Sequence, residues 1–250
     1  MSQAFYDALA IPTACELGKP IFKKLFLENG DLDVTDKKAL KDDIERIRWL
    51  YTLKPSTLNV PAYMQDGLEY PEVAVLQIDL STPTRAKRIA SFVHRAIPYP
   101  LLLVLVYGDT FVVGVANKRI SQADKSKWVI EDEWLTEWIN PTAPTSVQRQ
   151  FMADCALKNL SSLNFYAFYQ SLVARVVALN AATRSGNYAA GTAEKTSDRR
   201  QVLAEIAGLE REIAELRTQL KAETQFNRKL ELNMAIKTRA DTVKTLENRL

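Results

Sequence analysis

Histidine, cysteine and glycine are scarce in this 250-residue sequence, which has one histidine, two cysteines and eight glycines. A single histidine excludes metal sites built on several histidines, and we expect His94 to be a hydrogen-bonded structural residue. Cys15 and Cys155 have neither the paired spacing of a zinc site nor a disulfide framework, so we expect two packed thiols. No cluster of glycines precedes a lysine and a serine or threonine, and nucleotide hydrolysis is therefore not expected.

An excess of charge of one sign and a long apolar run are also lacking. The 33 basic and 30 acidic residues give a net charge of +3, which is too near balance to predict nucleic-acid or membrane binding. No segment reaches ~18 uninterrupted apolar residues, and the first residues do not resemble a secretion signal. We therefore expect a cytoplasmic protein without a membrane partner. With 47% hydrophobic residues, the chain can bury a sizeable core.

A β–α–β unit is the clearest pattern in the first half of the chain. Residues 72–80 (EVAVLQIDL) have the β-branched character of a strand, and residues 84–97 form a helical pattern that ends before Pro98. The continuous apolar run at 101–107 predicts a strand buried on both faces. A reversal then leads into an antiparallel strand at 110–119. We predict an α/β (α+β) domain, with a mixed sheet and packed helices, over residues 1–140.

The remaining segments are assigned by periodicity and by turn-forming residues. Apolar residues at intervals of three and four predict an amphipathic helix over residues 35–53. A short strand at 128–130 and a helix through 134–138 would complete the domain. A helical segment at 146–182 is apolar over a wide arc, so it should dock on the sheet domain. Residues 183–197 are small and polar, which is typical of a flexible linker.

Two series of apolar residues in the segment 198–250 have the alternating spacing of a coiled-coil seam. Their registers differ, so either one helix continues through a discontinuity or the chain folds back near Phe226. Because no glycine or proline marks a turn, we favour the continuous helix, which would pair with a second copy or a partner. The alternative is a helix that lies back on the same molecule. The seam positions are Val202, Ile206, Leu209, Ile213, Leu216 and Leu220, then Leu232, Ile236, Val243, Leu246 and Leu250.

One arrangement of charged residues would suit a Mg²⁺-dependent nuclease. Glu72 and Asp79 flank the first core strand, and Lys118 ends the antiparallel strand, where it could lie near an attacking water. The acidic–x–lysine tripeptide common in such strands is absent, so this is the less favoured hypothesis. A local basic patch is a further possibility, although a scattered solvated surface is the preferred interpretation. Its members would be Arg85, Lys87, Arg88, Arg95, Lys118, Arg119, Lys125 and Lys127.

Six short peptides resemble, in the same order, an uncharacterised bacterial family: a domain of unknown function encoded beside Swi/Snf-like helicases and methyltransferase–restriction genes in antiviral defence clusters. The resemblance covers about residues 19–250 apart from the linker, and it brings no established catalytic residues. The peptides are KLFLENGDL, DIERIRWLYTLKPSTLNV, RAIPYPLLL, ANKR, KWVIEDEWLTEWI and ETQFNRKLELN. Matching positions are Lys54, Thr57, Asn59, Asp79, Pro98, Tyr99, Pro100, Lys118, Gln225, Phe226, Asn227 and Asn233.

The resemblance implies a DNA-acting defence apparatus, and we expect a non-catalytic accessory or scaffold subunit of it. Its partners would be a helicase or methyltransferase-type protein, a second copy through the coiled coil, and DNA as a further candidate. No cofactor is expected, apart from Mg²⁺ if the nuclease hypothesis holds. Folding does not obviously require Lys54, Asn59, Asp79 or Lys118, so these residues, with Arg119, are the predicted binding face.

Overall fold

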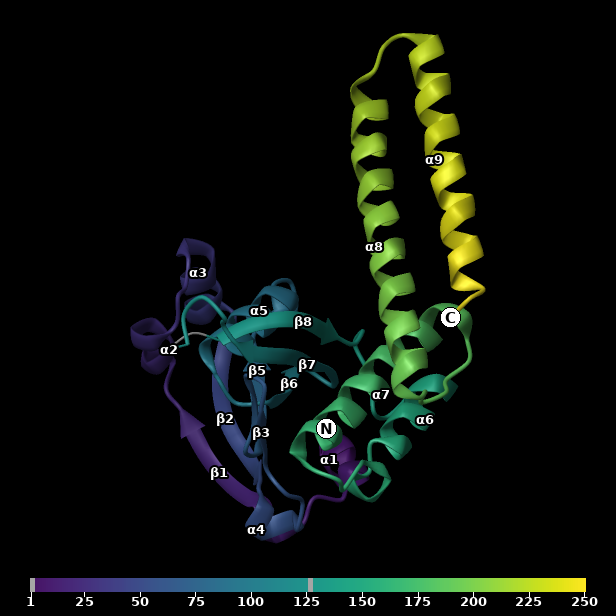
Figure 1. The fold of residues 1–250 in the computed structure, drawn as a ribbon. Coiled ribbons are helices and arrows are strands. Elements are labelled where there is room, and N and C mark those ends of the chain that lie inside the picture. Colours follow the sequence, from purple (N-terminus) through teal and green to yellow (C-terminus); the bar gives the residue numbers. More distant parts are fainter. Residues whose placement is uncertain (1–2, 126–127) are drawn as a thin grey trace. The chain divides into compact units, whose positions relative to one another are not determined.

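The chain divides into two compact units, Met1–Val176 and Val177–Leu250, which are described separately. The computed structural model describes residues 3–125 and 128–250 (Figure 1). The first unit contains a six-stranded mixed sheet, as predicted, in which β5 (Val73–Leu80) and β6 (Leu101–Tyr107) are the parallel pair among the residues described. In sheet order the strands are β1 (Glu16–Ile21), β2 (Ile44–Leu53), β5 (Val73–Leu80), β6 (Leu101–Tyr107), β7 (Thr110–Ile120) and β8 (Trp128–Leu135).

The predicted β–α–β unit is confirmed as β5, helix α5 (Ala86–Ala96) and β6. Alternate side chains of β5, among them Leu76 and Ile78, face α5 and form the main core with helices α2 (Lys23–Asn29) and α3 (Val34–Asp42). Strand β6 lies between β5 and β7 and is buried from Leu101 to Leu105, which explains its unbroken apolar sequence.

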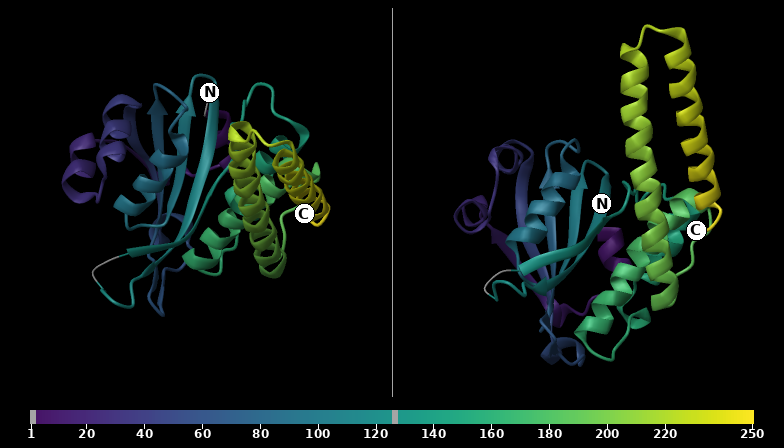
Figure 2. Two further views of the ribbon diagram at one scale, coloured as in Figure 1. Left: turned by 90° about the horizontal axis from the view of Figure 1, so that it is seen from above. Right: turned by 45° about the horizontal axis from the view of Figure 1, so that its top comes forward.

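The opposite face of the sheet is covered by other helices (Figure 2). Phe5 stacks on Phe111 and Phe151, and the hydroxyl of Tyr169 donates to the carbonyl of Leu101. The segment predicted to dock on the sheet therefore does so through α6 and the first half of α7. The helices that cover this face are α1 (Gln3–Leu9), α6 (Ser146–Asp154) and the first half of α7 (Phe165–Ser185). The short helix α4 (Pro55–Leu58) and a two-stranded ribbon of β3 (Tyr63–Gln65) and β4 (Leu68–Tyr70) complete the first unit.

The predicted helix over residues 35–53 is wrong in its second half. Helix α3 begins after Asp33, whose side chain accepts from the amide of Asp36, and it ends at Asp42. After Asp43, residues 44–53 form β2, which pairs with both β1 and β5. The predicted helix through 134–138 is also absent, since β8 runs to Leu135. In both places, pairing with a distant strand outweighs the local three-to-four spacing.

The second unit contains a helical hairpin, so the predicted continuous helix is wrong. Helices α8 (Ala193–Ala222) and α9 (Phe226–Glu247) lie antiparallel and pack on each other (Figure 1). The carboxylate of Glu223 accepts from the amides of Thr224 and Gln225, at 2.8 and 2.9 Å, and so holds the reversal. Glu223 and Gln225 have extended backbone angles that any residue adopts, which is why neither glycine nor proline is needed.

The two predicted seams form the two sides of this hairpin. Val202 and Ile206 of α8 pack on Leu246 of α9, and Leu209, Val243 and Leu250 pack against this cluster. Arg184 at the end of α7 pairs with Glu210 and with Glu247, at 3.0 Å each. The linker is shorter than predicted, because α7 extends to Ser185 and α8 begins at Ala193. The seams thus contact each other within one molecule near Leu250, while Leu216, Leu220, Leu232 and Ile236 towards the other end of the hairpin are partly buried.

We expect Ile206→Asp to unfold the hairpin, because Ile206 is fully buried and an unpaired carboxylate there would be desolvated. The cost should be about 3 kcal/mol or more. Far-UV circular dichroism during thermal unfolding measures it, and Ala207→Asp on the exposed neighbouring position is the matched control. A dimeric wild type that Ile206→Asp converts to a monomer of unchanged helix content would show instead that the seam is intermolecular.

Candidate functional site

Two of the residues predicted for the binding face have roles in folding. The backbone amide and carbonyl of Lys54 bond the hydroxyl of Thr57 at the start of α4, at 3.2 and 3.0 Å. Asn59 ends the same helix with a φ of 55°, a left-handed conformation that asparagine tolerates better than most residues. The exposed side chain of Lys54 remains available to a partner.

Asp79 belongs to a polar network on the face of the sheet opposite α5. Its carboxylate accepts from Arg46 at 2.8 Å and from the amide of Gln77 at 2.5 Å, with Arg48 at 3.5 Å. Gln77 in turn accepts from the hydroxyl of Tyr6. This network joins β2, β5 and α1, so Asp79 is an ion-paired residue whose charge is neutralised within the domain.

Lys118 is buried inside the domain. Its ammonium donates to the carbonyls of Ile97 and Tyr99, at 2.5 and 3.0 Å, directly after the end of α5. Burial lowers the pKa of Lys118 to about 7. A cation at this position satisfies carbonyls that the helix leaves unpaired and fixes the loop that leads into β6. Lys118 therefore supports a loop from within and does not lie on an open face.

The three residues of the nuclease hypothesis do not converge. Asp79 pairs with Val106 near the end of β6, whereas Lys118 bonds Tyr99 before that strand begins. Tyr99 and Val106 are seven residues apart, which corresponds to about 23 Å of extended chain. Glu72 precedes β5 and lies at the end of that strand opposite to Asp79. No group of three or more histidine, cysteine, aspartate or glutamate side chains among the described residues is placed to hold a metal ion.

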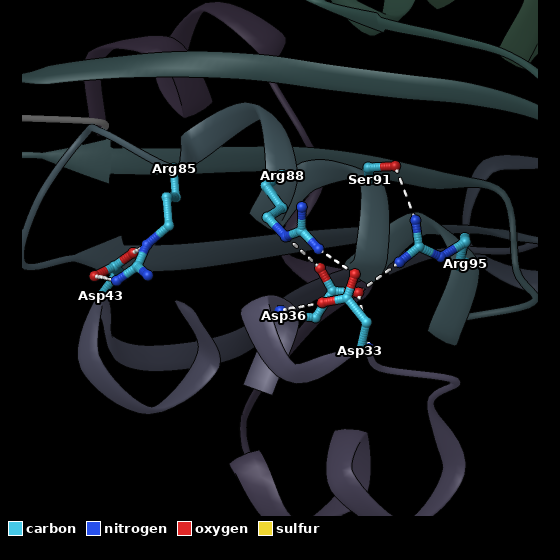
Figure 3. Close-up of polar contacts among 7 residues, drawn as sticks. All are labelled: Asp33, Asp36, Asp43, Arg85, Arg88, Ser91 and Arg95. Atoms are coloured by element: carbon cyan, nitrogen blue, oxygen red, sulfur yellow. Dashed lines mark hydrogen bonds and ion pairs between the residues drawn. The ribbon is translucent and has the colours of Figure 1, made fainter. Parts of the chain in front are cut away.

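The basic residues of α5 form an ion-pair network with α3 (Figure 3). Arg85 makes two bonds to the buried Asp43, while Arg88 contacts Asp33 and Asp36. Arg95 also bonds Asp36, at 2.8 Å. These pairs fasten α3 to α5 and neutralise the arginines of the predicted patch.

An open groove of about 730 Å³ lies over this network, and Lys87 and Glu133 are among its lining residues. Lys87 has no ion-pair partner among the described residues. Arg119 pairs with Glu131 on β8, at 2.7 Å. Lys127 lies outside the described residues. The predicted basic patch is therefore mostly a set of internal ion pairs, and its character as an anion site is weak.

An apolar pocket of about 280 Å³ lies beside the loop that Lys118 supports. The ring of Tyr99 meets that of Trp49 edge to face, with centroids 6.0 Å apart. Sequence patterns missed this pocket because its walls come from four separate segments, although three of the family-like peptides contribute to it. It is lined by Ile21, Leu25, Phe26, Trp49, Ala96, Ile97, Pro98 and Tyr99.

A second apolar surface lies at the end of the hairpin. Phe226, Leu230 and Met234 of α9 are 78%, 53% and 63% exposed. Their spacing of four places them along one side of the helix, about 160° from the seam that faces α8. This outer stripe consists of Phe226, Leu230 and Met234, and it begins within the family-like peptide ETQFNRKLELN. The spacing of four is visible in the sequence, but the apolar seam residues of the same helix follow a similar spacing, so the pattern alone does not distinguish the outer stripe.

The distal end of the hairpin is also basic. Arg217, Lys221, Lys229 and Lys237 have no ion-pair partner in the part of the chain that the structure describes, whereas Glu223 is bonded to the turn. Among the described residues, no helix combines the length and the hydropathy that crossing a membrane requires.

Comparison with known proteins gives a family and no characterised relative. The sequence profile described as "Domain of unknown function (DUF4391)" matches residues 9–241. Neither a curated protein nor a solved structure matches the chain.

Proposed function

The chain belongs to the DUF4391 family, and we propose that it is a non-catalytic accessory subunit of a bacterial DNA-acting defence system. In this proposal the C-terminal hairpin attaches the subunit to a helicase-type partner. The association with helicases and with restriction genes comes from the resemblance of the short peptides described above.

The outer stripe of α9 is the observation on which the proposal depends. Three large apolar side chains in a row are exposed on α9, on the side of the helix away from the seam that faces α8. Exposed apolar rows of this kind are typical of helices that bind a partner through one apolar face. The cations of the same hairpin that have no ion-pair partner among the described residues favour a partner with an acidic surface.

The nuclease alternative finds less support in this geometry. Asp79 and Lys118 are separated along the sheet, and both are engaged in internal bonds. A carboxylate neutralised by two arginines is a poor ligand for Mg²⁺ unless those pairs break. We therefore retain the nuclease only as an outcome that the experiment below can detect.

We expect the full chain to bind the helicase encoded nearest to it in its host, and Phe226→Asp/Leu230→Asp to weaken this binding at least tenfold. The physical reason is that two carboxylates would replace the apolar contact and would have to be desolvated in the complex. Isothermal titration calorimetry measures the affinity. The matched control is Thr238→Asp/Thr242→Asp, which adds the same charge at exposed positions of α9.

If Phe226→Asp/Leu230→Asp binds the helicase as tightly as Thr238→Asp/Thr242→Asp does, the outer stripe of the hairpin is not part of the interface. Plasmid cleavage by the purified chain alone, if it needs Mg²⁺ and disappears in Asp79→Ala, would overturn the non-catalytic part of the proposal. Calorimetry and cleavage thus test the two parts separately.

A further inference from the structure

We propose that the apolar pocket beside Trp49 and Tyr99 is a docking site for a short acidic peptide segment of another protein, with one bulky apolar side chain inserted into the pocket. This site lies in the first unit and does not depend on the hairpin. It would give the α/β domain a binding role of its own.

The size of the pocket indicates what it can hold. Pockets that enclose drug-sized ligands or cofactors are usually about 300–1,000 Å³, and this one is about 280 Å³. The walls are almost entirely carbon, so they offer little to orient a polar small molecule. A single leucine, phenylalanine or tryptophan side chain matches both the volume and the chemistry.

The pocket is built to keep its shape without an occupant. The indole nitrogen of Trp49 donates to the carbonyl of Tyr51 at 3.0 Å, which fixes the ring on β2. On the opposite wall, Lys118 holds the carbonyls of Ile97 and Tyr99 from behind. Those polar atoms are therefore occupied, and Pro98 between them restricts the backbone further. A preformed pocket lowers the entropic cost of binding.

The rim carries an unpaired positive charge. Lys19 of β1 lies directly opposite Trp49 of β2, so the two side chains share the face of the sheet that lines the pocket. Lys19 is exposed and has no ion-pair partner among the described residues. Lys23 and Lys24 follow on α2, where Lys24 pairs with Glu28. A carboxylate next to the inserted apolar side chain would meet Lys19, which selects an acidic segment.

The neighbouring strand edge is unsuited to the main alternative mode of peptide binding. β1 is an edge strand, and an extended peptide could in principle add to it as a seventh strand. However, Pro20 has no amide hydrogen, and Gly18 has a positive φ of 63° where the register shifts. Both features disrupt a regular ladder and protect the edge. Recognition would therefore rest on the pocket and on Lys19.

The test is selection of displayed random ten-residue peptides on the full chain. We expect the selected peptides to contain one bulky apolar residue with aspartate or glutamate close by. Binding should fall at least tenfold with Leu25→Glu, which places a carboxylate in the pocket wall. Leu27→Glu on the same helix should leave it unchanged, since the two leucines are 49% and 50% exposed and only Leu25 lines the pocket.

Lys19→Glu provides a second variant on an exposed strand, and it should weaken binding and reverse the preference for acidic peptides. Selected peptides that are basic, or that bind Leu25→Glu as well as the wild type, would overturn the proposal. Self-association or single-stranded DNA binding that Leu25→Glu abolishes, without any peptide that depends on Leu25, would also overturn it. In those cases the occupant would be a second copy or a nucleic acid.

Discussion

Replacing Arg85 by Met should destabilise the protein by about 3 kcal/mol, because it leaves the carboxylate of Asp43 buried without its partner. The Asp43 side chain is 4% exposed, and both of its oxygens accept from Arg85. Chemical denaturation of Arg85→Met, of Asp43→Leu and of the wild type gives the free energies of unfolding. Replacing the other partner, in Asp43→Leu, should lower the free energy of unfolding by less, since Arg85 is partly exposed and can be solvated by water.

The double variant Arg85→Met/Asp43→Leu completes the cycle. We expect it to recover much of the stability lost in Arg85→Met, because an apolar pair needs no desolvation of charge. Additive losses in the two single variants would contradict a coupled pair. The ion pair fastens the start of α5 to the end of α3 (Figure 3). The same variants should therefore loosen the packing of α3 on α5.

The central part of the fold could be predicted from the sequence because its signals are local. The apolar run of β6 and the prolines before and after α5 define the β–α–β unit without reference to distant residues. The strand β2 could not be predicted in this way. Ile44 and Ile47 fit a helical face as well as a strand, and the choice is made by pairing with β1 and β5.

The helical hairpin could also be predicted only in part from the sequence. The seam positions were identified by spacing, but the spacing does not reveal whether the second seam belongs to the same molecule. The reversal depends on hydrogen bonds from the Glu223 side chain to two backbone amides, and glutamate is not a residue associated with turns. The change of register between the two seams was the one sequence feature that indicated it.

The candidate sites were harder to predict from the sequence than the fold was. Lys118 is polar and lies near the end of a strand, which is typical of a surface residue, yet its ammonium lies against two backbone carbonyls in the interior. Burial of this kind depends on how a loop from another part of the chain closes over it. The apolar pocket has the same origin, because Leu25, Trp49 and Tyr99 meet only after the sheet and two helices have packed.

Two buried bases should each make a contribution to stability that rises with pH. His94 is fully buried, neither ring nitrogen has a hydrogen-bond partner among the described residues, and burial holds its pKa well below 6.5. The hydrogen bonds expected for His94 from the sequence are therefore not found. Burial likewise lowers the pKa of Lys118 to about 7, against 10.5 in the unfolded chain. Glu133 faces Lys118 and partly opposes this shift.

A base with a lowered pKa binds fewer protons in the folded state than in the unfolded state. Below pH 6.5 the unfolded chain therefore gains a proton at His94 that the folded chain does not, and stability falls as the pH falls. Between about pH 7 and 10.5 the unfolded chain keeps a proton at Lys118 that the folded chain has lost, so the contribution of Lys118 to stability rises through this window. Above about pH 9 the buried Cys155, Tyr6, Tyr70 and Tyr169, whose pKa values burial raises, act in the opposite direction. Each difference contributes at most about 1.4 kcal/mol per pH unit.

Two variants distinguish the pH range in which His94 affects stability from the range in which Lys118 does. His94→Leu should flatten the dependence below pH 6.5 and leave the alkaline rise in place, whereas Lys118→Met should remove the rise between pH 7 and 9.5, which amounts to roughly 2–3 kcal/mol. Denaturation at a series of pH values measures both slopes. An unchanged alkaline slope in Lys118→Met would mean that the folded protein keeps this lysine charged, with its two carbonyl bonds outweighing burial. The slope thus reports directly on the charge that lies behind the Tyr99 loop and the apolar pocket.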